Sequence, residues 1–119
     1  MGTWGSGNFD SDGALDAYAG LVHGIAEQID EGLGEGDVQF EDVDGEIALM
    51  EVLAVIGERC RALHLPLAQV ESWARRVLAA YDAQIDALGA TEAFKAERRA
   101  VLESTFDRLR AAVRGVRQT

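Results

Sequence analysis

The sequence predicts an all-α fold: a small bundle of about four helices, with an irregular glycine-rich N-terminal arm packed on the central helix. Apolar residues recur at intervals of three and four over most of the chain after residue 13. Glycine, proline and short polar residues interrupt this pattern, and the opening residues lack it. We therefore expect one domain with an arm over 1–12, a helix over 13–31, a loop over 32–44 and helices over 45–63, 66–88 and 91–114.

The arm combines glycines with large aromatic residues. Gly5 and Gly7 permit tight turns and close backbone approach, which other residues resist. Trp4 and Phe9 offer large apolar areas that are worth burying. We expect these two aromatic side chains to pin the arm to the body of the protein.

The helix expected over 13–31 has a clear start. Asp10, Ser11 or Asp12 caps it through a side-chain oxygen, and the remaining acids suit the positive end of the helix dipole. Glycines over 32–36 break the helix. Its apolar stripe consists of Leu15, Tyr18, Leu21, Val22, Ile25 and Ile29.

The helix expected over 45–63 is apolar nearly all round, which predicts a place at the centre of the fold. Glu51 lies within this apolar run, and a buried carboxylate needs hydrogen-bond donors or a cation. One hypothesis is that Glu51 accepts hydrogen bonds from the Trp4 indole or from amides over 5–7. The other is that Glu51 faces solvent beside Glu58.

Two more helices follow. Pro66 suits the start of the third helix and Gly89 its end, while Thr91 caps the fourth helix and Gly115 closes it. Basic residues crowd the fourth helix, but acids are interleaved with them. This mixture is typical of a solvated, salt-bridged face and not of a surface that binds membrane or nucleic acid.

Two segments resemble a known family. The opening reads Met1-Gly2-x-Trp4-Gly5-x-Gly7-x-Phe9-Asp10-x-Asp12, and a later segment leads from Phe40-Glu41 through Gly45 into Ala48-Leu49-Met50-Glu51-Val52-Leu53-Ala54. Both are similar to a group of small bacterial proteins catalogued as domain of unknown function 4259. The resemblance covers about half of the chain, and Ser11 stands where members commonly have Asn. Because the family has no established activity, the resemblance implies no catalytic residue.

Charge is divided unevenly along the chain. Residues 1–58 contain 14 acidic residues and no Lys or Arg, whereas the remainder contains 7 acidic and 11 basic residues, for a net charge of −10. One interpretation is that the acidic half packs against the basic half and the excess acids are solvated. The other is an acidic binding face, for which the candidates are Asp37, Glu41, Asp42 and Asp44. Nucleic acid is not expected as a partner, because its phosphates repel this charge.

The composition also indicates a compartment. Cys60 is the single cysteine and cannot form an internal disulfide. No apolar run has the length of a membrane span, and the N-terminus lacks the pattern of a signal peptide. We therefore expect a cytoplasmic protein that does not bind membrane.

Catalytic and metal-binding patterns are weak. We find no nucleophile motif, no cluster of Cys and His at metal-ligand spacing and no phosphate loop. Segments 8–19 and 40–51 each match part of a calcium-binding loop. The first has Ala19 where the bidentate carboxylate belongs, and the second has Phe40 at the first ligand position. Helix-capping acids explain both segments, so we expect no bound metal or other cofactor.

These observations predict a non-catalytic protein-interaction module with an acidic face. A role like that of an immunity protein or an antitoxin would suit the charge, because an acidic face can block a basic effector protein. The partner would then be another protein, and a basic one. The alternative is a calcium-binding or enzymatic module built on the N-terminal loop and the segment 40–51.

Overall fold

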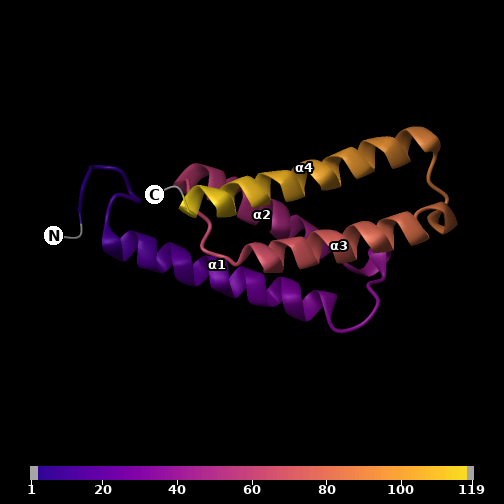
Figure 1. Cartoon of the computed structure of the whole chain (residues 1–119), viewed down its shortest axis with the longest axis horizontal. Helices are drawn as coiled ribbons and strands as arrows, with labels where there is room; N and C mark the ends of the chain where they lie inside the picture. Colours follow the sequence, from indigo (N-terminus) through magenta and orange to yellow (C-terminus); the bar gives the residue numbers. More distant parts are fainter. Residues whose placement is uncertain (1–2, 118–119) are drawn as a thin grey trace.

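The computed structural model describes residues 3–117, with side chains through Arg114. Its four long helices form an elongated bundle (Figure 1), and the predicted all-α fold is confirmed. Within these residues the only β pairing is an isolated bridge between Thr3 and Ser11. The elements are α1 (Asp12–Leu33), the 3₁₀ turn η1 (Phe40–Asp42), α2 (Asp44–Cys60), α3 (Leu67–Gln84), the 3₁₀ turn η2 (Asp86–Leu88) and α4 (Glu92–Arg117).

Helices that follow one another in sequence run antiparallel, but α2 and α4 are neighbours that run in the same direction. The Arg98 guanidinium, near the start of α4, lies over the Phe40 ring just before α2. Towards the other end, Arg108 of α4 donates hydrogen bonds to Glu58 of α2. In Figure 1, α2 runs behind α3 and then behind α4, while α1 and α4 occupy opposite sides of the bundle. Helix α4 therefore lies across the core from α1.

The apolar stripes of all four helices meet in one core. Trp73, Tyr81 and Phe106 are among its largest fully buried side chains. Helix α2 is less enclosed than its composition suggests, because Val52 and Val55 remain 43% and 50% exposed. The predicted central place of α2 holds where it packs against α1 and α4, but its opposite face has no helix packed against it. The residues that α2 buries are Ile47, Met50, Leu53, Ala54 and Gly57.

Several helix ends differ from the expected ones by a few residues. Ser11 caps α1, where its Oγ accepts a hydrogen bond of 3.2 Å from the Ala14 amide. Helix α2 ends at Cys60 because Arg61 adopts a left-handed conformation with φ of 58°. Helix α3 ends at Gln84 and is followed by η2. The fourth helix continues past the expected stop at Gly115, so that glycine does not close it.

Candidate protein-interaction surface

The ion pairs of the described side chains all lie after residue 57. Arg108 pairs with Glu58 at 2.6 Å, and Arg110 of α4 pairs with Glu71 of α3 at 2.5 Å. The hydrogen bonds from Arg108 lower the pKa of Glu58 from its usual range. Further pairs join Arg99 to Asp82 and Glu103, Lys95 to Asp86 and Glu92, and Arg110 to Asp107.

Helix α2 of the acidic half packs against α4 of the basic half, as the first interpretation of the charge division expects, and the pair of Glu58 with Arg108 joins the two halves. The 13 acidic residues that precede Glu58 take part in none of the ion pairs found among the described side chains. The reason is the arrangement of the helices: basic α4 lies against α2 and α3, across the core from acidic α1. The excess acids of the N-terminal half are therefore largely exposed to solvent, as that interpretation also expects.

The predicted acidic face lies on the connection between α1 and α2. We call residues 34–44 the acidic connection; it lies at the end of the bundle opposite the N-terminal arm (Figure 1). The structure brings all the predicted residues together there, each exposed, and adds Glu35, which the sequence analysis did not single out. The predicted residues are Asp37 in the loop, Glu41 and Asp42 in η1, and Asp44 at the start of α2.

The backbone of the acidic connection is fixed to α3. The Phe40 amide donates a hydrogen bond of 2.7 Å to Oε1 of Gln84, and Nε2 of Gln84 donates one of 2.8 Å to the Val38 carbonyl. The buried Phe40 ring packs edge-on against Tyr81, with 5.2 Å between ring centroids. Buried Val38 and Val43 complete the apolar underside. The acidic side chains thus project from a backbone that is held in place by contacts with α3.

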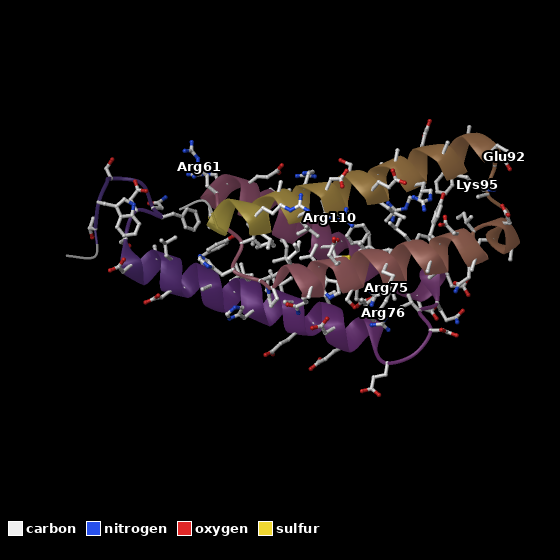
Figure 2. The ribbon with its side chains drawn as sticks, viewed as in Figure 1. Arg61, Arg75, Arg76, Glu92, Lys95 and Arg110 are labelled. Carbon is white, nitrogen blue, oxygen red and sulfur yellow. The ribbon has the colours of Figure 1, made fainter. Side chains whose placement is uncertain are left out.

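Arg76 fixes the other half of the connection. From α3, its Nη2 donates hydrogen bonds of 2.8 and 2.9 Å to the carbonyl oxygens of Gly34 and Gly36, and a longer one to that of Leu33 (Figure 2). A guanidinium at this place complements the negative end of the α1 dipole. Arg76 and Gln84 were not among the predicted site residues. Neither differs in sequence from an ordinary surface residue, so the helix pattern contained no signal for their roles.

The arm is a tight loop built around one carboxylate. The Trp4 amide donates to the Asp10 carbonyl at 3.0 Å, and the Gly7 amide donates to Oδ2 of Asp10 at 2.9 Å. A Cβ atom at Gly5 or Gly7 would lie 2.5 or 2.7 Å from that same oxygen. Close approach of the Asp10 side chain therefore requires glycine at both positions.

The aromatic residues hold the arm less firmly than expected. The Phe9 ring packs edge-on against Tyr18, and the Arg59 guanidinium lies 5.6 Å from its centroid, which places the arm against α1 and the C-terminal end of α2. Trp4, by contrast, is 57% exposed, so the expectation that it serves as a buried anchor is wrong. Asp12 lies exposed in the first turn of α1. Met1 and Gly2 of the opening motif lie outside the described residues.

Glu51 faces solvent. Its side chain is exposed on α2, and the hydrogen bonds that the structure gives to residues 3–11 of the arm do not involve it. The hypothesis of a bond between Glu51 and the arm is therefore wrong, because the arm lies at the C-terminal end of α2, more than two turns away. Hydrogen bonding to Glu58 raises the pKa of Arg108, and the charge of Glu51 adds to this effect.

The two partial calcium loops do not have the geometry of a calcium site. Helix α1 already begins at Asp12, and α2 begins at Asp44, so most of segments 8–19 and 40–51 is helical. A calcium loop instead curls its ligands around a central ion. Within residues 3–117, no three His, Cys, Asp or Glu side chains gather so that they could hold a metal ion.

Cys60, Tyr18 and His23 carry reactive groups, but their surroundings suit structural roles and not catalysis. Burial raises the pKa of the Cys60 thiol, which disfavours the thiolate needed by a nucleophile. Burial, with a smaller contribution from Cys60, raises the pKa of Tyr18 to about 12. Its hydroxyl donates a hydrogen bond of 2.5 Å to the Ala62 carbonyl, and His23 contacts the carbonyl oxygen of His64 at 3.2 Å. Tyr18 and His23 thereby join α1 to the turn between α2 and α3.

None of the helices in the described part of the chain has the length and apolar character that crossing a membrane requires. Comparisons with protein-family models, with curated proteins and with solved structures give no match. What the chain does is therefore inferred from its own residues and their arrangement.

Proposed function

We propose that the chain is a non-catalytic protein-interaction module whose acidic surface binds a basic protein, as an immunity protein or an antitoxin covers a basic effector. One observation carries this proposal: the acids before Glu58 have no ion-pair partner among the described basic side chains, while four basic residues of α4 pair with other acids. These four are Lys95, Arg99, Arg108 and Arg110. Like charges that repel one another disfavour the compact state. A basic partner would relieve this repulsion.

The anchored backbone of the acidic connection supports the same function. A surface that is already ordered loses less conformational entropy on binding than a flexible loop does. Arg76 and Gln84 provide this order from α3. An acidic surface also accelerates encounter with a basic partner through long-range attraction.

We further propose that the protein works in the cytoplasm of a bacterium. The bacterial origin follows from the resemblance of the opening motif to a small bacterial family. The compartment follows from the single Cys60, whose partly buried thiol has no internal cysteine to pair with.

The test is affinity capture of the tagged full-length chain from cells that produce it naturally. We expect a basic protein to be recovered at an equal molar ratio, and to be lost when the acidic connection is neutralised by Asp37→Asn, Glu41→Gln, Asp42→Asn and Asp44→Asn. The matched control neutralises four exposed acids of α4 instead, through Glu92→Gln, Glu97→Gln, Glu103→Gln and Asp107→Asn.

Both variants change the net charge equally, but the control also breaks the ion pairs of Glu92, Glu103 and Asp107 within α4. Circular dichroism therefore has to show the same helical fold in both variants before capture. Recovery of an acidic partner, or equal retention of the partner by both variants, would contradict the proposed function. Equal loss from both variants would show that overall charge, and not the acidic connection, governs binding.

A further inference from the structure

The outer face of the α1–α2 pair exposes apolar side chains that no other part of the described chain covers. Leu21 of α1 is 56% exposed, and Val52 and Val55 of α2 are similarly open. Ala48 is also exposed and lies one helical turn before Val52. We call this surface the outer α1–α2 face. Its apolar part is continuous along α2 over about two turns.

A hollow of about 360 Å³ continues this face towards the arm. Phe9, Leu21 and Ile56 contribute apolar walls, and Cys60 lies beside them. The hollow therefore lies between the exposed part of α1, the C-terminal part of α2 and the Phe9 ring of the arm, which contacts both helices. Its nearly apolar lining suits a hydrophobic side chain of a partner.

Glycines on the exposed side of α1 would allow the backbone of another helix to approach this face closely. Gly13, Gly20 and Gly24 lie within the helix, and a Cβ atom at any of them would meet no other atom within 4 Å. Glycine disfavours helix relative to alanine, so the fold of this chain gains nothing from these residues. With Ala17 they form an exposed row at helical spacing. Such a row allows another backbone to approach closely, as small residues do between packed helices.

Acidic residues border the α1 side of the face. On α1, exposed Glu27 and Glu31 continue the row beyond Gly24. Glu51 points to another side of α2, where its charge acts on Arg108 of α4. The acidic connection lies at the far end. Residues 1–58 contain no Lys or Arg, and near the arm positive charge comes from Arg59, which lies over the Phe9 ring.

We propose that the outer α1–α2 face docks a basic amphipathic helix of the partner protein. This inference rests on the proposed function and names both the contact surface and the partner's chemistry. The apolar side of that helix would cover Val52 and enter the hollow, its backbone would lie along Gly20 and Gly24, and its basic side would meet Glu27 and Glu31. The row from Gly13 to Gly24 is about 18 Å long, enough for about three turns of the docked helix.

Charge selects this occupant over two others. A second copy of the chain would bring one acidic face against another, and repulsion would oppose such a dimer. An anionic lipid surface would be repelled for the same reason. A basic amphipathic helix matches both the exposed apolar side chains of the face and the acidic residues beside them.

The test uses the full-length chain and a labelled synthetic peptide of leucine, alanine and lysine that forms an amphipathic helix, with binding measured by fluorescence anisotropy. A peptide of the same apolar face with glutamate in place of lysine is the second probe. We expect Val52→Gln, and separately the pair Gly20→Gln and Gly24→Gln, to weaken binding of the basic peptide about tenfold. The matched control is Val101→Gln, since Val101 is an exposed valine of α4 with an exposure of 47% against 43% for Val52.

The peptide measurements can contradict either the docking site or the choice of a basic helix. Wild-type affinity in both test variants, equal loss in the control, or the absence of any binding by the basic peptide would overturn the docking site. Equal binding of the acidic peptide would overturn the assignment of a basic helix. If a basic protein is captured from cells while the peptide results fail, the proposed function stands and this inference falls. If no basic protein is captured, the proposed function itself fails.

Discussion

The indole Nε1 of Trp73 donates a hydrogen bond of 2.7 Å to Oδ1 of Asp30, from a side chain that is only 1% exposed. The second carboxylate oxygen accepts a hydrogen bond of 2.8 Å from Gln69. This carboxylate thereby joins α1 to α3, which run in parallel. Because the indole nitrogen lies inside the core, its partner cannot be removed without leaving a buried donor unsatisfied.

Replacing this carboxylate should therefore destabilise the fold. We expect Asp30→Ala to lower the free energy of unfolding by about 1–3 kcal/mol, and Asp30→Asn to lower it less, because an amide oxygen can still accept from Trp73. Urea denaturation measures both. Glu27→Ala, at an exposed position one turn earlier, serves as the control and should stay within about 0.5 kcal/mol of the wild type. Equal loss in the alanine and asparagine variants would refute the role of the hydrogen bond.

Removing the guanidinium of Arg76 should loosen the acidic connection. We expect Arg76→Gln to lower the free energy of unfolding by about 1–2 kcal/mol, since three carbonyl oxygens lose their charged donor. Amide hydrogen exchange over residues 34–40 should accelerate, while exchange in the helical core stays slow. Arg75→Gln removes the same charge from the exposed neighbouring position and is the matched control (Figure 2). Similar exchange in both variants would contradict the clamp, by which we mean the hydrogen bonds from Arg76 and Gln84 that hold the acidic connection against α3.

Two helical glycines should respond to alanine in opposite directions. Gly20→Ala should raise the free energy of unfolding by about 0.5–1 kcal/mol, because the new methyl group enters open space and alanine favours helix. Gly57→Ala should lower it, because the new Cβ would lie 3.0 Å from that of Ala112 in α4 and 3.5 Å from that of Leu63. Thermal unfolding of the two variants gives the comparison directly. A destabilised Gly20→Ala would mean that the α1 row serves the fold of this chain after all.

The raised pKa of Tyr18 predicts a loss of stability in alkali. Burial favours the neutral phenol in the folded state, so this contribution is complete below the unfolded pKa of about 10 and is lost as pH rises towards the folded pKa of about 12. The loss should amount to about 2 kcal/mol over that interval. The chain has two tyrosines, so the absorbance of ionised tyrosine in a Tyr81→Phe variant reports Tyr18 alone. A midpoint near 10 in the folded variant would contradict the burial argument.

Local patterns predicted the helices well. The apolar stripe of α1 and the cap at Ser11 depend on neighbours within one or two turns, and both are visible in the sequence. Glu51 shows the limit of such patterns. Its apolar sequence neighbours suggested burial, but burial depends on which faces of α2 meet other helices, and the face bearing Glu51, Val52 and Val55 meets none fully.

The candidate surface was predicted in part. The acids of the acidic connection are visible as a run in the sequence, but their lack of basic partners depends on α4 lying across the core from α1. The uneven charge predicted that the two halves pack together with the excess acids solvated, but it could not identify which acids lack an ion-pair partner. The clamp by Arg76 and Gln84 joins residues about 40 positions apart, a distance at which no periodicity gives information.

The clamp on the acidic connection also determines where the chain could accept an insertion. Connections between helices usually tolerate added residues, because their backbones face solvent. Here the carbonyl oxygens of Gly34, Gly36 and Val38 are held by side chains of α3, so added residues would have to break those hydrogen bonds. The turn at Gly89 makes only a local hydrogen bond, to Asp86. A tag or a fluorescent domain belongs at that turn, where the acidic connection would stay intact.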